Sequence, residues 1–303
     1  MNHASLNRRQ TLAGLTASAA MLAAGRVQAF SDVAIGNATL TALSDGSLTV
    51  PPVLFTGLAE ADAVALGETV QLAANTYAYR SGDRVFLFDA GSGSDHYISQ
   101  QFPTVGQLPA DLKAAGIAAD EVTDIVISHM HIDHIGGLVA GGTPVFSNAS
   151  VHLSEVDWNF WNNEDLPTSV PDQIKPMVNA AQLVSSIVKE NVVTHKAEAD
   201  LGEGVVLLPT PGHTPGHSAV MLTSGSEQIM LIGDAIVSDK VHFANPDVGW
   251  ALEFDKAVAA QTRKSILDQA ATDKIRIAGS HLSTPGIGFV EKDASAYSFV
   301  PTS

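Results

Sequence analysis

From residue 38 onward, short runs of β-branched and apolar residues alternate with stretches whose apolar positions recur every three or four residues. The first pattern is typical of strands and the second of helices. We expect strands at 39–43, 48–50, 76–80, 85–89, 121–128, 151–153, 205–210, 218–223, 228–233 and 275–279. We expect helices at 108–115, 155–163, 173–189 and 254–271. The polar segments 44–47 and 81–83 predict tight turns, and therefore two hairpins near the start of this region.

The order of these elements predicts the fold class. Early hairpins followed by mixed strand and helix units are typical of two packed sheets flanked by helices. The sequence shows no internal repeat and no linker long enough to divide the chain. We therefore expect one α/β (α+β) domain over residues 30–303.

Four potential metal ligands follow the predicted strand at 121–128, namely His129, His131, Asp133 and His134. Loops at strand ends are where functional side chains concentrate. Imidazoles packed this closely repel one another when they take up protons, and a cation relieves the repulsion because it binds the neutral ring. The pattern therefore indicates a metal site rather than a turn with solvated histidines.

Three later strands also end near a candidate ligand. His213 and His217 follow the strand at 205–210, Asp234 ends the strand at 228–233, and His281 follows the strand at 275–279. Glycine before the ligand lets the backbone approach the site closely. The chain has no cysteine, so nitrogen and oxygen must hold the metal, which narrows the choice to zinc, manganese, iron, cobalt or nickel.

The motifs HxHxDH at 129–134, GHTPGH at 212–217, Gly233-Asp234 and Ser280-His281 together resemble the metallo-β-lactamase superfamily. The resemblance implies an αββα sandwich with two divalent metal ions, zinc first among the candidates. It implies one metal on His129, His131 and His213, a second on Asp133, His134 and His281, and Asp234 as the bridge. It also implies that a metal-bridging hydroxide attacks the substrate, while Asp133 or a water on the second metal protonates the leaving oxygen.

Two neighbouring residues have supporting roles in this interpretation. Asp89 either accepts an imidazole N–H and fixes the ring, or forms an Asx turn before Gly91. His217 is expected to make a structural hydrogen bond. We expect His152 and His195 to be structural, and His96 to lie near the substrate pocket together with His242.

The segments 41–46, 280–288 and 299–301 resemble methyl parathion hydrolase and its relatives, a subgroup that includes aryl esterases and lactonases. We therefore expect hydrolysis of small ester, lactone or phosphotriester substrates, which requires an apolar pocket beside the metals. The candidate pocket residues are Leu54, Phe55, Trp158, Trp161, His242, Phe243 and Leu282. Two alternatives stay open: a periplasmic class B-like β-lactamase, disfavoured by the missing cysteine ligand, and a non-catalytic metal-binding protein of the same fold.

Charge limits the partners of this chain. Acidic residues outnumber basic ones 32 to 16, and a chain beginning at Phe30 would keep 13 basic and all 32 acidic residues, a net charge of −19. Such a surface repels phosphate backbones, so we expect no nucleic-acid partner. The oligomeric state stays open between a monomer and a homodimer, the pairing common in the subgroup that the sequence resembles.

The amino terminus resembles an export signal. Arg8-Arg9 precedes an apolar, Ala/Gly-rich run at 11–25. Small or tolerated residues at 27–29, before a cut after Ala29, complete the order of a twin-arginine-type signal over residues 1–29. We therefore expect a periplasmic or secreted protein. The run is too short and too rich in Gly and Ser/Thr for a membrane span, so we expect no stable membrane association.

Overall fold

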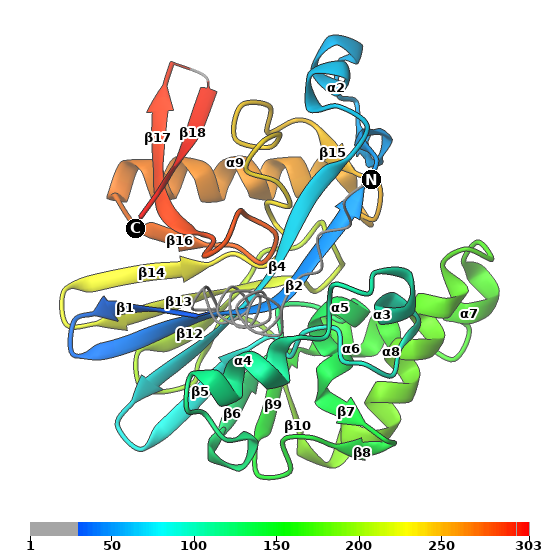
Figure 1. Ribbon diagram of the computed structural model, residues 1–303, viewed down its shortest axis with the longest axis vertical. Helices are drawn as coiled ribbons and strands as arrows, with labels where there is room; N and C mark the ends of the chain where they lie inside the picture. The colour runs from blue at the N-terminus through cyan, green and yellow to red at the C-terminus, as the bar shows by residue number, and fades with distance from the viewer. Residues whose placement is uncertain (1–29, 295, 303) are drawn as a thin grey trace, which may run out of the picture.

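Two sheets pack face to face with helices on both outer faces (Figure 1), which confirms the predicted αββα sandwich and its single domain. The computed structural model describes residues 30–294 and 296–302. The predicted export signal at 1–29 lies outside the described residues. Among the helices of the described part, none combines the length and the apolar character that crossing a bilayer requires.

The first sheet has seven strands in the order β1-β2-β4-β5-β6-β9-β10. Its strands are β1 (Ser31–Ile35), β2 (Ala38–Val50), β4 (Val70–Ser81), β5 (Arg84–Phe88), β6 (Asp124–Val126), β9 (Ser150–Ser154) and β10 (Val192–His195). Pairing is antiparallel from β1 to β5 and parallel from β5 to β10. The parallel part therefore sends the ends of β5 and β6 to the same edge of the sheet.

The second sheet also has seven strands, in the order β11-β12-β13-β14-β16-β17-β18. Its strands are β11 (Ala199–Asp200), β12 (Val205–Pro209), β13 (Ser218–Ser224), β14 (Glu227–Leu231), β16 (Arg276–Ala278), β17 (Ile287–Asp293) and β18 (Ala296–Pro301). β13 is antiparallel to both β12 and β14, and β14 is parallel to β16. The ends of β12, β14 and β16 therefore also share one edge.

Helices cover the outer face of each sheet, while α2 projects from the body at the top of Figure 1. The helices are α2 (Glu60–Leu66), α3 (Tyr97–Gln101), α4 (Leu108–Ala114), α5 (Ile132–Ile135), α6 (Glu155–Trp161), α7 (Leu166–Ser169), α8 (Lys175–Val188) and α9 (Lys256–Asp273). The remaining short elements are 3-10 turns and strand pairs: η1 (Pro52–Leu54), η2 (Ala119–Glu121), η3 (Gly136–Leu138), η4 (Lys189–Asn191), β3 (Phe55–Thr56) with β15 (Gly249–Trp250), and β7 (Val139–Ala140) with β8 (Thr143–Pro144). The four helices expected from the sequence are α4, α6, α8 and α9, each within two residues at both ends.

Three apolar layers hold the sandwich together. One lies between the first sheet and its helices, one between the two sheets, and one between the second sheet and α9. Successive residues of β4 contribute to different layers: Tyr77 and Tyr79 face the second sheet, and Ala78 faces the helices. Because central strands are buried on both faces, their sequences read as nearly continuous apolar runs.

The prediction of a hairpin with its turn at 44–47 is wrong. The segment is one strand, β2, whose pairing register with β4 shifts between Ser44 and Gly46. Asp45 lies at this β-bulge, is fully buried, and accepts the backbone N–H groups of Ser92 (2.8 Å) and Leu108 (3.0 Å). A β-bulge whose polar side chain accepts hydrogen bonds from buried neighbours contains the same residue types as a solvated turn, so the sequence alone does not distinguish the two.

The second predicted hairpin is confirmed, because β4 and β5 pair through a turn in which Gly82 has a φ of 57°. The strand expected at 121–128 is shorter than predicted: β6 covers only Asp124–Val126. Residues 119–121 form η2 instead, and the chain after β6 leaves the sheet for the loop that carries His129.

A buried ion pair fixes the loops that follow β14. Arg263 of α9 is fully buried against Glu253, and its guanidinium also donates to the carbonyls of Ala235 (3.0 Å), Pro246 (2.8 Å) and Val248 (2.9 Å). Ala235 directly follows Asp234, so this ion pair helps to set where that carboxylate lies.

Replacing Glu253 with alanine leaves the buried guanidinium of Arg263 without its counter-charge. We expect this variant to lower the free energy of unfolding by roughly 3–5 kcal/mol, measured by urea denaturation. Lys264→Ala is the control, because its ion pair with Asp247 is exposed on both sides and should contribute less than about 1 kcal/mol. Equal, small losses in both variants would contradict the role given to the buried pair.

Candidate metal centre

Seven polar side chains meet at the edge that the two sheets share. They follow the ends of β6, β12, β14 and β16, and α5 carries two of them. Two compact groups of donor atoms result, in each of which all donor atoms lie within 4.8 Å of one another: His129, His131, His213 and Asp234 form the first, and Asp133, His134 and His281 form the second. The structure thus brings together every metal ligand that the sequence analysis nominated.

In the first group, three ring nitrogens surround one point. Nδ1 of His131 lies 2.9 Å from Nε2 of His129 and 3.0 Å from Nε2 of His213. Oδ2 of Asp234 lies 3.3 Å from Nε2 of His213 and 3.9 Å from Nε2 of His129. Each histidine therefore presents one nitrogen to the same small volume.

The carboxylate of Asp234 also lies close to the second group. Its Oδ1 lies 3.4 Å from Nε2 of His134, and its Oδ2 lies 3.2 Å from Nε2 of His281. Asp133 is within reach of the same two nitrogens, with its Oδ2 3.7 Å from His134 and 3.5 Å from His281. The Asp234 carboxylate is therefore shared between the two groups.

The donor set fits two divalent cations. Zn–N and Zn–O bonds of about 2.0–2.2 Å at tetrahedral angles place neighbouring ligand atoms roughly 3.3–3.6 Å apart, close to the spacings found here. Nε2 of His134, Nδ1 of His213 and Oδ1 of Asp234 are buried and have no hydrogen-bond partner among the described residues. Buried polar atoms are normally satisfied, and a cation would satisfy those of His134 and Asp234.

Burial disfavours the charged form of the histidines in both groups. It lowers the pKa of His129, His131 and His213, that of His131 to about 4, so these rings are neutral at pH 7 and keep a lone pair for a cation. Burial opposes the charged form of His281 as well, but Asp234 and Asp133 outweigh it and raise the pKa of His281 to about 10. Cation binding at the second group must therefore release a proton.

Asp89 holds one of these rings in place. It follows β5 with a φ of 59°, and its carboxylate accepts the backbone N–H of Ser128 (2.8 Å) and the Nδ1–H of His134 (2.7 Å). Because Nδ1 of His134 donates, Nε2 is the nitrogen left free toward the donor groups. This is the arrangement in which a carboxylate orients a metal-binding imidazole.

His217 stands beside the centre without joining either group. Its Nε2 accepts the backbone N–H of Asp234 (3.1 Å), and its Nδ1 donates to the carbonyl of Thr210 (3.1 Å). Both ring nitrogens are thus used in hydrogen bonds, and the one at Nε2 holds the loop of Asp234.

An apolar cleft of about 260 Å³ opens onto the donor groups. Its lining includes four of the seven nominated ligands, His131, Asp133, Asp234 and His281. The rest of its lining comes from seven elements or loops: Leu48 and Val50 of β2, Leu54, Leu72 of β4, Tyr97, Ile98, Gln101 and Phe102 around α3, Ile132 of α5, Gln173, Ile174 and Met177 around α8, and Trp250 with Leu252.

Of the pocket residues expected from the sequence, only Leu54 is on this lining. Phe55, His242, Phe243 and Leu282 are buried in the core, where His242 accepts the N–H of Val237 (3.1 Å). Trp158 packs against the helix layer of the core, and Trp161 lies edge-on to His131 with ring centroids 5.3 Å apart. Spacing of three along a helix brought these tryptophans to one face, but that face packs on the protein itself.

The other histidines lie away from the donor groups. His96 bonds the carbonyl of Gly136 (3.1 Å) and is not on the cleft lining. His152 and His195 stack on each other at the far strands β9 and β10, with His152 also bonded to Asp124 (3.1 Å).

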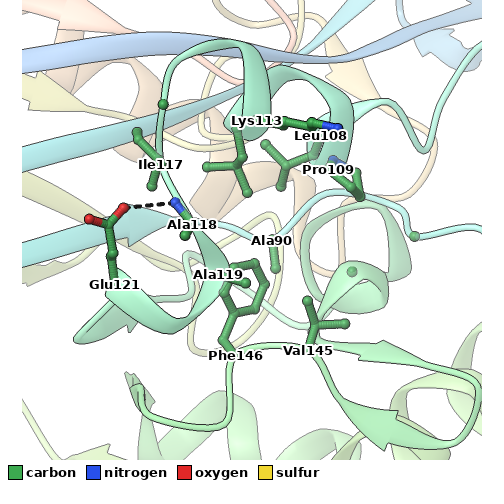
Figure 2. A pocket seen from close by; sticks show the side chains of 14 residues that line it. Ala90, Leu108, Pro109, Lys113, Ile117, Ala118, Ala119, Glu121, Val145 and Phe146 are labelled. Carbon is green, nitrogen blue, oxygen red and sulfur yellow. Dashed lines mark hydrogen bonds between the residues drawn. The ribbon is translucent and has the colours of Figure 1, made fainter.

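A larger cavity of about 460 Å³ lies beside the loop that follows Asp89 (Figure 2). Leu108, Ile117, Val145 and Phe146 make its walls apolar, and none of the nominated ligands lines it. Its size alone therefore does not make it a candidate for the chemistry.

Comparisons with known proteins agree with this geometry. The family model described as "Metallo-beta-lactamase superfamily" matches residues 69–281. An N-acyl homoserine lactonase of Bacillus thuringiensis is 27% identical over 165 residues, which cover 50% of this chain and 56% of the relative. The chain thus spans about half the length of the curated relatives it matches.

Two solved structures share the fold over nearly their whole length. AidC, a dizinc quorum-quenching lactonase in complex with a product, superposes with a TM-score of 0.83 and 28% identity, covering 90% of this chain and 97% of AidC. The hydrolase AbOPH superposes with a TM-score of 0.84 and 26% identity, covering 92% of this chain and 99% of AbOPH.

Replacing Asp234 with alanine removes the one carboxylate that both donor groups share. We expect bound transition metal, measured by elemental analysis after equilibrium dialysis, to fall from two ions per chain to one or none. Turnover should fall by more than about a hundredfold, because loss of even indirect support for a metal ligand costs 10–100-fold. Asp273→Ala, an exposed carboxylate at the end of α9, is the control. Two ions and full turnover in Asp234→Ala would rule out the shared position.

Proposed function

This chain belongs to the metallo-beta-lactamase superfamily, and we propose that it hydrolyses small lactones and esters at a binuclear metal centre. The observation that carries the proposal is one cleft of about 260 Å³ that joins apolar walls to the donor groups. Zinc is the first candidate metal, because the similar AidC is a dizinc lactonase. The similarity to N-acyl homoserine lactonases makes lactones with an acyl side chain the first substrates to test.

One set of residues would hold the metal ions, and the cleft residues would hold the substrate. His129, His131 and His213 would hold one cation, Asp133, His134 and His281 the second, and Asp234 would contact both. When bound, two such cations supply a hydroxide nucleophile near neutral pH and Lewis acidity toward the attacked oxygen. Phosphotriesters fit the same chemistry, so they belong in the substrate panel.

The cleft itself selects for apolar substrates. Ile98 and Phe102 around α3 and Ile174 and Met177 around α8 would remove an acyl or aryl group from water, which favours binding by about 25 cal/mol per Å² of apolar surface. Tyr97, Gln101 and Gln173 are the polar residues of this lining besides the nominated ligands. Their hydroxyl and amide groups can donate hydrogen bonds that orient an ester, lactone or side-chain amide oxygen.

Export is a separate part of the proposal. The order of Arg8-Arg9, an apolar run and Ala29 supports a twin-arginine-type signal and a periplasmic or secreted enzyme. Fractionation of a host that expresses the full chain tests it: mature protein beginning at Phe30 outside the cytoplasm is the expected result, and uncleaved protein retained in the cytoplasm would contradict it.

A substrate panel tests the activity. Zinc-loaded full-length protein should open N-hexanoyl-L-homoserine lactone and cleave an aryl acetate, with the acid released measured by a pH indicator. A chelator should abolish turnover, and added zinc should restore it. Absence of turnover on lactones, aryl esters, phosphotriesters and nitrocefin would favour a metal-binding protein without catalysis, and fast cleavage of nitrocefin alone would favour a β-lactamase.

The cleft walls predict a dependence on acyl chain length. Met177→Ala removes apolar surface from the wall formed by α8, so kcat/KM for a long-chain acyl lactone should fall about tenfold through KM, since roughly 1.4 kcal/mol corresponds to a factor of ten. A lactone without an acyl side chain should be hydrolysed at an unchanged rate.

The matched control for this variant is Leu183→Ala on the same helix, because Leu183 is 56% exposed and is absent from the cleft lining. If Met177→Ala slows both lactones equally, or neither, the acyl group does not lie against α8.

A further inference from the structure

A buried acid that none of the motifs includes joins two of the ligand loops. Asp157 lies in α6 and its residue is 0% exposed. Its Oδ2 accepts the backbone N–H of Met130 (2.8 Å), and its Oδ1 accepts the backbone N–H of Gly216 (3.0 Å). Both carboxylate oxygens are therefore bonded to backbone, each to a different loop.

Both donors of these hydrogen bonds are backbone N–H groups next to or near the nominated histidines. Met130 lies between His129 and His131, and Gly216 lies between His213 and His217. The first loop follows β6 of the first sheet, and the second follows β12 of the second sheet. One carboxylate thus connects the loops of opposite sheets at the point where Nδ1 of His131 and Nε2 of His213 come within 3.0 Å.

The contact between α6 and the second loop is also a close backbone contact. A Cβ atom added at Gly216 would lie 2.2 Å from the backbone nitrogen of Asp157 and 2.8 Å from its Cβ. Glycine is therefore required at 216 for the loop to reach the first turn of α6. Trp161 of the same helix lies edge-on to His131, so α6 contacts the first loop at a second point.

Burying the carboxylate of Asp157 costs free energy unless hydrogen bonds compensate for the loss of water. Burial raises the pKa of Asp157 to about 6, against the opposing effect of the hydrogen bonds it accepts. A buried carboxylate is tolerated where its oxygens satisfy donors that would otherwise be unpaired. The two N–H groups of the ligand loops are such donors.

We propose that Asp157 is a positioning residue that sets the spacing of His131 and His213, and through it the affinity of the first metal position. The inference rests on the proposed binuclear function. Asp157 touches neither donor group directly, so it acts through the backbone of the two loops. The second metal position, built from Asp133, His134 and His281, receives no bond from Asp157.

The test is Asp157→Asn in the full chain, with metal affinity as the readout. The asparagine oxygen can accept one of the two N–H groups, but its NH2 group faces the other donor, so one loop is released. Titration with Co²⁺ against a competing chelator, followed by the visible spectrum, should show the affinity for one of the two ions lowered 10–100-fold. The affinity for the other ion should stay within about threefold of wild type, since the residues of that position keep their bonds.

The matched control is Asp111→Asn. Asp111 is also a buried helical carboxylate, and it accepts the backbone N–H of Ser44 (2.7 Å), which is in a strand and not in a ligand loop. Urea unfolding of the metal-free proteins should show comparable losses of stability in both variants, while only Asp157→Asn weakens Co²⁺ binding. Wild-type Co²⁺ binding in Asp157→Asn, together with lowered stability, would overturn the positioning role.

Gly216→Ala tests the same idea with the carboxylate retained. The added methyl group pushes the second loop away from α6, so it should weaken binding of the same single Co²⁺ ion. Unaltered binding of both ions in this variant would also overturn the inference. Wild-type protein that fails to bind two Co²⁺ ions would instead contradict the binuclear function on which the inference rests.

Discussion

Five imidazoles and two carboxylates share one small volume, six of the seven residues being buried, and this is the constraint on which the rest of the structure depends. Without a cation, polar atoms of His134 and Asp234 have no hydrogen-bond partner among the described residues. Burying polar groups without partners costs free energy, and placing two divalent cations among them reverses the cost. The cluster therefore makes physical sense as a metal centre and is difficult to explain as part of an ordinary core.

The sandwich provides what such a cluster requires. Each donor follows a strand, so the rigid sheets fix where the loops begin. Hydrogen bonds that the loops donate to Asp89, His217 and Asp157 fix the course of the loops. On the second sheet, Arg263 holds the loop after Asp234 through backbone carbonyls. The loops that carry the donors are thus held by hydrogen bonds to buried side chains, which is how a protein keeps a charged site at a defined geometry.

The metal ligands could be predicted because their signal is local. Four of them, His129, His131, Asp133 and His134, fall within six residues, and the others follow Gly-containing strand ends, so short motifs identify them before any tertiary contact is known. The cleft is different, because Leu72, Tyr97, Met177 and Trp250 lie on elements that only the folded chain brings together. For the same reason Trp158 and Trp161 could not be assigned: helical spacing places them on one face without saying what covers it. The roles of Asp45 and Asp157 could not be predicted, because a buried acid that accepts hydrogen bonds from the backbone has no sequence motif. The sequence of the segment around Asp45, 44–47, is typical of a turn.

The central claim is that two metal ions occupy the shared edge of the sheets. The most direct measurement is a crystal structure of zinc-loaded protein with anomalous diffraction data on both sides of the zinc edge. A binuclear centre predicts two anomalous peaks, one among His129, His131 and His213 and one among Asp133, His134 and His281, with Asp234 in contact with both. No peak, or zinc bound only at histidines outside the two groups, such as His195, would contradict it.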